Sequence, residues 1–340
     1  MIRSPNWLGD IILCLPAVQA LRRAIPDTRL EVLVKKSMAQ LWEMTDVDTV
    51  IPFSCRRGMK GLADRRALAR DLKKRAFDTA LIFPNSFDAA LLPYMAGIPE
   101  RAGWPTQGRG LLLNNRILYP RHLDSQQQPE RDIYLISRWL GQELSMPASI
   151  LLTIPADAKS AVAAQKETMA RRIIGLNPGA TYGPAKCWLP ERFAQTALRA
   201  HAELGCDVII TGGPGDVAVC GQVYDHIAGQ DPHASAWCRN LAGQTGIAEL
   251  AAWLEQCACL VTNDTGGMHV SAAVGTPVVA IFGPTNWNRT APLGTGHKLI
   301  KATVPCDAKC KRRCVADHRC MKSVTVDMVM QAVGEVMENG

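Results

Sequence analysis

A carboxylate at residue 10 stands where a strand-to-helix loop ends, in the segment 6–10 with sequence NWLGD. Asp10 can accept hydrogen bonds from free backbone N–H groups and act as the N-cap of the helix that follows. It can also serve as a general base in a loop that faces a ligand, and Gly9 would let a substrate approach the backbone closely. The local sequence leaves both interpretations of Asp10 open.

A phosphate-binding loop is one interpretation of the segment 177–186, NPGATYGPAK, which follows an expected strand. The hydroxyl of Thr181 and the glycine N–H groups are donors that suit a phosphate, and Lys186 adds a positive charge. The P-loop pattern GxxxxGK[ST] is absent. The alternative is a loop rich in proline and glycine that ends in a solvated lysine.

A second anion site is predicted in the segment 262–269, TNDTGGMH, which also joins an apolar strand to a helix. The N–H groups of Thr265 and Gly266 would lie at the helix N-terminus, where the backbone dipole favours negative charge. Asp264 can accept hydrogen bonds from sugar hydroxyls or cap the helix. A histidine in the first turn, here His269, is more often a packing residue than a catalytic one.

The turn 211–216, TGGPGD, followed by Ala218, formally fits the dinucleotide pattern GxGxxA through Gly213 and Gly215. This would suggest a nicotinamide-dependent dehydrogenase as an alternative class of enzyme. Pro214 argues against it because proline removes an N–H from the phosphate-facing turn. A loop that faces a nucleotide, with Asp216 near a ribose, stays consistent with the residues.

A cysteine-rich segment near the C-terminus could hold a structural zinc ion or an iron–sulfur cluster. Its candidate ligands are Cys306, Cys310, Cys314 and Cys320, with His318 between the last two. The spacing matches neither the paired C-x2-C zinc pattern nor the common ferredoxin patterns. We therefore favour free thiols or a disulfide over a metal, and the interleaved Lys and Arg side chains favour thiolates.

The elements that position these segments follow from hydrophobic periodicity. Short apolar runs alternate with amphipathic helical patterns in two blocks, which is typical of parallel sheets covered by helices on both faces. The expected strands are 30–34, 48–53, 78–83, 172–176, 207–211, 239–241, 259–262 and 278–282. The expected helices are 10–25, 38–44, 62–74, 89–96, 132–140, 191–204, 217–228, 247–256, 268–274 and 326–337.

This alternation predicts an α/β chain with two Rossmann-like, doubly wound domains that face each other across a cleft, where ligands bind at the carboxyl ends of the strands. Residues 97–129 are expected to be loops, and the linker to lie at about 146–166. Pro16 is expected in the first turns of a helix that begins late. The predicted parts are an N-terminal domain 1–155, a C-terminal domain 156–325 and a terminal helix 326–340.

The formal net charge of +7 is unevenly distributed. Residues 56–75 hold nine Lys or Arg against two Asp, and residues 301–322 hold seven against two, so the remainder is slightly acidic. An uneven charge distribution gives information about what the protein binds and not about its fold. A module that only binds nucleic acid or anionic lipid is disfavoured because few aromatic residues interleave with the basic ones.

The sequence contains no apolar run long enough for a transmembrane helix, and Asp10 interrupts the N-terminal apolar run in a way that does not suit a signal peptide. We therefore expect a cytoplasmic protein with reduced cysteines.

In combination, five stretches resemble the heptosyltransferases that build the inner core of lipopolysaccharide, glycosyltransferase family 9. They are Pro84-Asn85-Ser86-Phe87; Ala96-Gly97-Ile98-Pro99 with Gly103-Trp104; Pro178-Gly179-Ala180 with Gly183-Pro184-Ala185-Lys186; Asn240-Leu241-Ala242-Gly243; and Thr262-Asn263-Asp264. The resemblance covers most of the chain. It implies a GT-B fold, with the acceptor bound by the first domain and the nucleotide sugar by the second.

The resemblance also implies an inverting transfer of heptose from ADP-heptose to a heptosylated Kdo2-lipid A type acceptor, which adds the second heptose, with no required cofactor or catalytic metal. The alternative within the resemblance is another heptosyltransferase of the same family. Asp10 matches the family's proposed base and Lys186 the lysine that neutralises the leaving diphosphate. The donor would be held by Thr181, Asp216, Asp264, Thr265, Gly266 and His269, and the acceptor by Asn85 and Ser86.

The acceptor class suggests where such a protein works. A phosphorylated glycolipid lies in an anionic membrane, so the basic segment 56–75 is expected to dock the protein on the cytoplasmic face of the inner membrane. Nucleic acid is not an expected partner.

Overall fold

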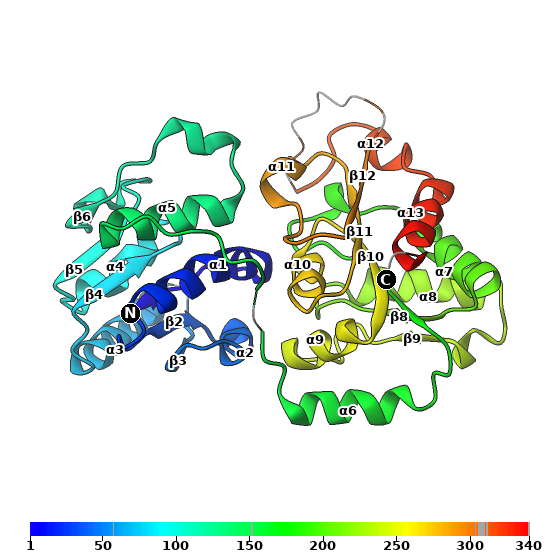
Figure 1. Cartoon of the computed structure of the whole chain (residues 1–340), viewed down its shortest axis with the longest axis horizontal. Coiled ribbons are helices and arrows are strands. Elements are labelled where there is room, and N and C mark those ends of the chain that lie inside the picture. The colour runs from blue at the N-terminus through cyan, green and yellow to red at the C-terminus, as the bar shows by residue number, and fades with distance from the viewer. Residues whose placement is uncertain (57, 151, 303, 305–309, 311, 339–340) are drawn as a thin grey trace. The chain divides into compact units, whose positions relative to one another are not determined.

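The computed structural model describes residues 1–56, 58–150, 152–302, 304, 310 and 312–338. The chain divides into two compact units, Met1–Ile150 and Leu151–Gly340 (Figure 1). Each unit contains one six-stranded sheet with parallel strand pairs and helices on both faces. This confirms the prediction of two doubly wound α/β units.

In unit 1 the strand order is β3-β2-β1-β4-β5-β6. The strands are β1 (Ile2–Arg3), β2 (Glu31–Lys35), β3 (Thr49–Phe53), β4 (Thr79–Ile82), β5 (Glu100–Gly103) and β6 (Asn115–Arg116). The helices are α1 (Leu8–Ala24), α2 (Ala39–Glu43), α3 (Gly58–Lys74), α4 (Phe87–Met95) and α5 (Gln128–Leu140), with 3₁₀ turns η1 (Lys36–Met38), η2 (Arg109–Leu111) and η3 (Arg121–Ser125). Helices α1 and α5 pack together, and α3 packs on α4.

In unit 2 the order is β12-β11-β10-β7-β8-β9. The strands are β7 (Ile173–Asn177), β8 (Asp207–Ile210), β9 (Cys238–Asn240), β10 (Cys257–Asn263), β11 (Val278–Phe282) and β12 (Lys298–Lys301). The helices are α6 (Ala156–Lys166), α7 (Pro190–Leu204), α8 (Val217–Ala228), α9 (Ile247–Glu255), α10 (Gly266–Ala273), α11 (Trp287–Thr290), α12 (Arg319–Lys322) and α13 (Val326–Glu338), with 3₁₀ turns η4 (Pro184–Lys186) and η5 (Ala234–Ala236).

The C-terminal helix α13 is part of the second unit. It packs on α7 and crosses β10, β11 and β12 (Figure 1). Its apolar face, which includes Val329, Val333 and Val336, is buried in the same core as the inner strands. Burial of such a face stabilises a helix more than its intrinsic propensity does.

Both sheets have the same topology: the first strand of each unit lies in the middle, and the chain winds first to one side and then to the other. The winding reverses between β1 and β4 in unit 1 and between β7 and β10 in unit 2. In open parallel sheets the loops at such a reversal diverge to opposite faces and leave a crevice for ligands at the carboxyl ends of the strands. The fold thus singles out four loops as candidate ligand-binding segments.

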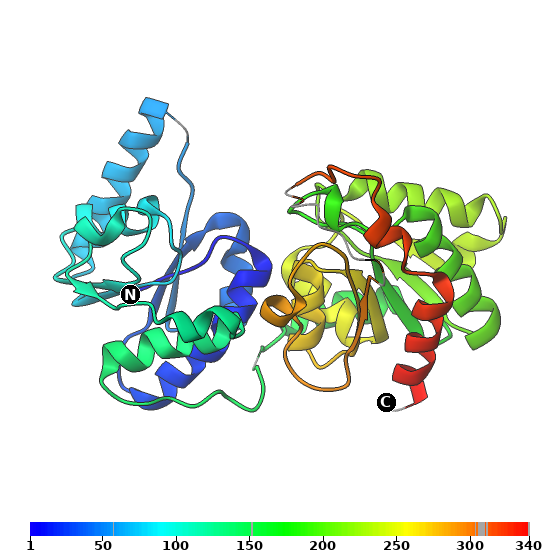
Figure 2. The same cartoon turned by 90° about the horizontal axis from the view of Figure 1, so that it is seen from above.

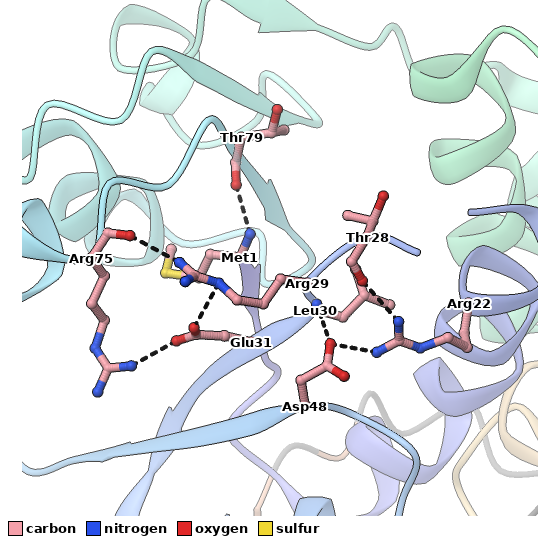
Figure 3. Close-up of polar contacts among 9 residues, drawn as sticks. All are labelled: Met1, Arg22, Thr28, Arg29, Leu30, Glu31, Asp48, Arg75 and Thr79. Carbon is pink, nitrogen blue, oxygen red and sulfur yellow. Dashed lines mark hydrogen bonds and ion pairs between the residues drawn. The ribbon is translucent and has the colours of Figure 1, made fainter. Parts of the chain in front are cut away.

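The opposite, amino-terminal edge of the unit 1 sheet is closed by a network of ion pairs (Figure 3). Glu31, which is nearly fully buried, lies 3.0 Å from Arg29 and 2.7 Å from Arg75. The amino group of Met1 donates to the carbonyl of Thr79 at 2.7 Å. These contacts tie β2, β4 and the end of α3 together, so this edge serves the fold and leaves the carboxyl edge for ligands.

Three expectations about elements are wrong in part. Helix α1 begins at Leu8, so Pro16 lies in its middle rather than in its first turns. The stretch 97–129 contains the strands β5 and β6, which have charged residues and therefore lack an apolar run. The expected linker contains α6, which packs on α9 of unit 2.

Candidate functional site

The switch point of unit 2 brings two of the predicted segments together. The segment with Lys186 follows β7, and the segment with Asp264 follows β10, the strand paired with β7. Asp216 follows β8, on the other side of β7. In unit 1, Asp10 follows β1 and Asn85 follows β4, again at the switch point. Each predicted site residue outside the cysteine cluster therefore lies beyond the carboxyl end of a strand.

Lys186 and Asp264 form an ion pair across the unit 2 switch point. Nζ of Lys186 lies 2.7 Å from Oδ2 of Asp264, and the two side chains are only 16% and 5% exposed. The lysine also lies 5.2 Å from the ring centre of Tyr182, which adds a cation–π contact. A charge held in this way keeps a defined position, because the pair is largely shielded from water.

Asn263, at the end of β10, fixes this pair by joining its two loops. Its buried amide donates to the carbonyl of Pro178 at 2.7 Å and accepts the backbone N–H of Trp188 at 2.9 Å. Pro178 and Trp188 lie on either side of Lys186 in the sequence. The two bonds therefore attach the loop that contains Lys186 to Asn263, which directly precedes Asp264. Asn263 is not among the predicted site residues, because an amide at a strand end has no distinctive local pattern.

The N-terminus of α10 provides backbone donors beside the ion pair. Its N-cap is Thr265, which has an extended backbone and makes no capping hydrogen bond with its side chain. Both Thr265 and Gly266 are half-buried. A Cβ on Gly267 would lie 2.3 Å from the amide nitrogen of Asn177, so this position needs glycine for α10 to pack closely on β7. The arrangement is suited to a phosphate group.

His269 is buried in the first turns of α10. Burial lowers its pKa to about 4, with Asp264 opposing the shift and Lys186 adding to it. At neutral pH the imidazole is therefore uncharged. In the part of the chain that the structure describes, its Nδ1 atom is buried without a hydrogen-bond partner. A buried polar atom of this kind calls for a partner, and a bound ligand could provide one.

Thr181 and Asp216 lie in loops on either side of these residues. Thr181 is exposed in the turn after β7. Asp216 accepts the N–H of Gly213 at 3.0 Å, and burial raises the pKa of its carboxyl. A Cβ on Gly179 would lie 2.2 Å from Cγ of Asp216, so the two loops are in direct contact. Since the Gly213 N–H is already used, the GxGxxA turn does not present it to a dinucleotide.

Asp10 lies in the first turn of α1, half-buried, at the third position of the helix. The N-cap is Trp7, so the interpretation of Asp10 as the N-cap is wrong. The neighbouring helix α5 contributes Asp132, which is buried. Burial raises the pKa of Asp132 well above its usual range, and the negative charge of Asp10 raises it further. The surroundings of Asp132 thus favour its protonated form.

Asn85 and Ser86 connect β4 to α4. Ser86 is the N-cap residue of α4 and makes no capping bond with its side chain. Asn85 is held by two residues that the sequence analysis did not assign: the Thr106 hydroxyl donates to its carbonyl at 3.3 Å, and Arg109 donates to Oδ1 at 3.4 Å. Arg109 is fully buried and also donates to the carbonyls of Trp104 and Pro84, so it fixes the whole loop.

A second buried arginine supports the loop before Asp10. Arg3 ends β1, donates to the carbonyl of Ser4 at 2.5 Å and to Oδ1 of Asn6 at 3.1 Å, and lies over the ring of Phe53. Burial lowers its pKa to about 10, so it remains charged at neutral pH. The two buried guanidinium groups give the carboxyl edge of the unit 1 sheet a positive character.

Three of the four candidate metal ligands can be placed, and Cys306 lies outside the described residues. Hydrogen bonds from the backbone N–H groups of Ala316 and His318, and one from Cys310, lower the pKa of Cys314. Cys320 is buried in the core of unit 2. Among the described residues no group of three or more His, Cys, Asp or Glu is arranged to hold a metal ion.

Comparisons with known proteins show what the chain is similar to. Residues 65–319 match the model described as glycosyltransferase family 9 (heptosyltransferase). The chain is 31% identical over 319 residues to lipopolysaccharide heptosyltransferase 2 of Escherichia coli K12, which covers 88% of this chain and 87% of that protein. It is 28% identical over 356 residues to lipooligosaccharide heptosyltransferase 2 of Haemophilus ducreyi, with 99% of both chains covered.

Solved structures show the same fold. The structure of the E. coli ADP-heptose lipopolysaccharide heptosyltransferase II matches with a TM-score of 0.84 and 28% identity, over 99% of this chain and 98% of that one. The E. coli heptosyltransferase WaaC with ADP matches with a TM-score of 0.73 over 98% of each chain, at 19% identity. The GT-B fold expected from the sequence is confirmed.

Proposed function

The chain belongs to glycosyltransferase family 9, and we propose that it transfers L-glycero-D-manno-heptose from ADP-heptose to the inner core of lipopolysaccharide and adds the second heptose. One observation of geometry supports this most directly. The Lys186–Asp264 ion pair lies at the switch point of unit 2, beside the open N-terminus of α10. A cation and backbone N–H donors together suit a nucleotide diphosphate that leaves during transfer.

The proposed reaction is a single displacement with inversion. The acceptor hydroxyl oxygen attacks the anomeric carbon of heptose and forms the new glycosidic bond, while the bond to the diphosphate oxygen breaks. Asp10 takes the hydroxyl proton as general base. Lys186 and the N–H groups of Thr265 and Gly266 stabilise the negative charge that develops on ADP. These residues supply both the base and the leaving-group stabilisation from side chains and backbone.

The remaining site residues have binding roles in this proposal. Thr181 and His269 donate hydrogen bonds to the phosphate oxygens of ADP-heptose or exchange them with its sugar hydroxyls, and Asp216 binds the ribose. Unit 1 holds the acceptor through Asn85 and Ser86. The acceptor is a heptosylated Kdo2-lipid A type glycolipid, whose acidic groups suit the positive edge formed by the buried arginines of unit 1.

A transfer assay tests this function directly. Purified protein is incubated with ADP-heptose and with Kdo2-lipid A that carries or lacks the first heptose. We expect one heptose to be added to the heptosylated acceptor, with one ADP released per transfer, and no product with the bare acceptor. Transfer to the bare acceptor alone would assign the first heptose instead, and ADP release without any product would contradict both assignments.

We also propose that the protein docks peripherally on the cytoplasmic face of the inner membrane. None of the helices among the described residues is long and apolar enough to cross a bilayer. Helix α3 projects from the rest of unit 1 (Figure 2). Arg66, Arg70 and Lys73 are exposed at a spacing that puts them on one face, with the exposed Leu62 one turn earlier. A basic face with an apolar residue suits an anionic lipid surface.

Reversing the charge of this face by Arg66→Glu, Arg70→Glu and Lys73→Glu should weaken binding to vesicles of anionic lipid by at least about a hundredfold, because each cation near such a surface contributes about 1 kcal/mol. Vesicle co-sedimentation measures this. The control variant has the same change in charge at the exposed Arg23, Lys36 and Arg171. Equal binding by the two variants would refute docking through α3.

For the cysteine-rich segment we propose reduced thiols rather than a structural metal. The described cysteines include a hydrogen-bonded pair, Cys310 and Cys314, and the buried Cys320. Elemental analysis of protein purified without added metal or chelator should find less than stoichiometric zinc and iron, and thiol titration under reducing conditions should count the accessible cysteines as thiols. One zinc or iron per chain would overturn this proposal.

A further inference from the structure

The segment 312–318 packs directly on the turn that presents Lys186. Ala185, the residue before Lys186, has both of its backbone polar groups bound to this segment. Its N–H donates to the carbonyl of Arg312 at 3.2 Å, and its carbonyl oxygen lies 3.3 Å from Nε2 of His318. Because a carbonyl can only accept, Nε2 carries the proton in this contact.

A glycine allows the two backbones to come this close. Gly183 is the N-cap residue just before η4 and has a φ of +144°, and a Cβ there would lie 2.3 Å from the carbonyl oxygen of Arg312. No side chain fits between the turn and the segment. Because the two backbones are in direct contact, a shift of the segment 312–318 would also shift the turn.

His318 is held in a demanding conformation that directs its ring toward Ala185. Its backbone is left-handed, with φ 61° and ψ 25°, which costs a residue with a side chain about 1 kcal/mol or more. Its carbonyl accepts the N–H groups of Met321 and Lys322 in the last half of the short helix α12. Met321 is fully buried and anchors α12 in the core of unit 2. The conformation is thus maintained by tertiary contacts, as strained residues near functional sites often are.

The turn depends on this support because it has few bonds of its own. It is the three-residue turn η4, and its first residue is Pro184, which lacks an N–H. Lys186 donates to the carbonyl of Gly183 within the turn, and its side chain reaches Asp264. Cys187 also donates to the carbonyl of Pro184, and Asn263 binds the loop on either side at Pro178 and Trp188. Between these points, Ala185 is the residue next to Lys186 whose backbone is held from outside the loop, by the segment 312–318.

We propose that His318 is a positioning residue that places the Lys186 ammonium group where charge develops on the leaving diphosphate. This rests on the function proposed above for Lys186. His318 itself touches no substrate in this proposal; it acts through the Ala185 carbonyl. A misplacement of about 1 Å in a catalytic group can lower the rate about a hundredfold, so a single lost hydrogen bond to the turn has a measurable effect.

Two substitutions separate the hydrogen bond from the backbone conformation. His318→Gly removes the ring but adopts the left-handed conformation without steric cost, so the melting temperature should stay equal or rise. We expect kcat for heptose transfer to fall about tenfold, and ADP affinity to fall only about threefold, because the transition state needs the ammonium group at a defined place whereas bound ADP can shift to keep its contact. His318→Asn tolerates the same conformation and keeps a donor, so it should recover much of kcat. Arg313→Ala, an exposed neighbour, is the control.

A double-mutant cycle tests whether His318 acts through Lys186. In the Lys186→Ala background, His318→Gly should cause no further loss of kcat or ADP affinity, because the group that it positions is gone. The full tenfold loss in that background, or wild-type kcat in His318→Gly alone, would overturn the proposal. Calorimetry measures ADP affinity without an acceptor. The cycle can therefore be completed with ADP binding alone, even if the transfer assay shows that the proposed function is wrong.

Discussion

Asp10→Asn should abolish heptose transfer while leaving ADP affinity and the melting temperature close to those of the wild type. The amide is nearly the same size as the carboxylate, but it cannot take the proton of the acceptor hydroxyl. Loss of a general base lowers rates by about a hundredfold to ten-thousandfold. Transfer of heptose, ADP binding by calorimetry and thermal unfolding, measured on one preparation, check the three parts of this expectation.

The surroundings of Asp10 explain why Asp10→Asn should lower the rate of transfer and leave the stability of the fold unchanged. Asp10 lies in the first turn of α1, where the helix dipole favours its negative charge by about 1 kcal/mol or less. Asp132 on the adjacent α5 is buried, and burial followed by the charge of Asp10 raises the pKa of Asp132 well above its usual range. Replacing one half-buried acid by an amide leaves the packing of α1 on α5 intact.

A matched control is Asp27→Asn, an exposed aspartate just beyond the other end of α1. It changes the net charge of unit 1 equally and should leave transfer at the wild-type level. If Asp10→Asn retained transfer within tenfold of the wild type, the role of base would have to move to another residue. If it lost ADP binding as well, its defect would lie in folding rather than in proton transfer.

Much of the fold could be predicted from the sequence because parallel strands are buried on both faces and appear as apolar runs. The expected bounds of 278–282 and 217–228 match β11 and α8. The strand β12, at the edge of the sheet, was not predicted because its end residues Lys298 and Lys301 leave only two apolar residues between them. Helix α6 was not predicted because it is weakly amphipathic.

The site was harder to predict because its contacts depend on topology. Lys186 and Asp264 are 78 positions apart and meet only because β7 and β10 pair at the switch point. The roles of Asn263 and Arg109 are likewise invisible locally, since each joins loops that are distant in the sequence. Residue types and spacing identified the segments that carry chemistry, whereas the side chains that hold those segments in place required the three-dimensional structure.

Lys186→Ala should weaken ADP binding about tenfold to a hundredfold, the range expected for a hydrogen bond between charged groups worth about 1.5–3 kcal/mol. The effect on kcat/KM should be larger, about a hundredfold to a thousandfold, because the leaving diphosphate gains charge in the transition state. ADP calorimetry and steady-state kinetics with varied ADP-heptose measure the two effects. Lys298→Ala, which removes a lysine of a surface ion pair at the amino edge of the same sheet, should change neither.

Because Lys186 is paired with Asp264, its removal should do more than take away one cation from the site. Without the lysine, the 5% exposed carboxylate of Asp264 loses its ion-pair partner and faces the incoming diphosphate. Breaking such a pair also lowers the free energy of unfolding by about 3 kcal/mol. Part of the loss in ADP affinity should therefore come from repulsion by Asp264 and not from the missing lysine.

The double variant Lys186→Ala with Asp264→Asn separates these two contributions. It removes the uncompensated charge, so it should bind ADP more tightly than Lys186→Ala alone and unfold at a higher temperature, while kcat stays low. If the double variant bound ADP no better than the single one, Asp264 would not face the diphosphate, and unchanged ADP affinity in Lys186→Ala would remove the lysine from the donor site. Recovery of ADP affinity without recovery of kcat would show that Lys186 acts on the leaving group and that Asp264 holds the lysine in place until the donor binds.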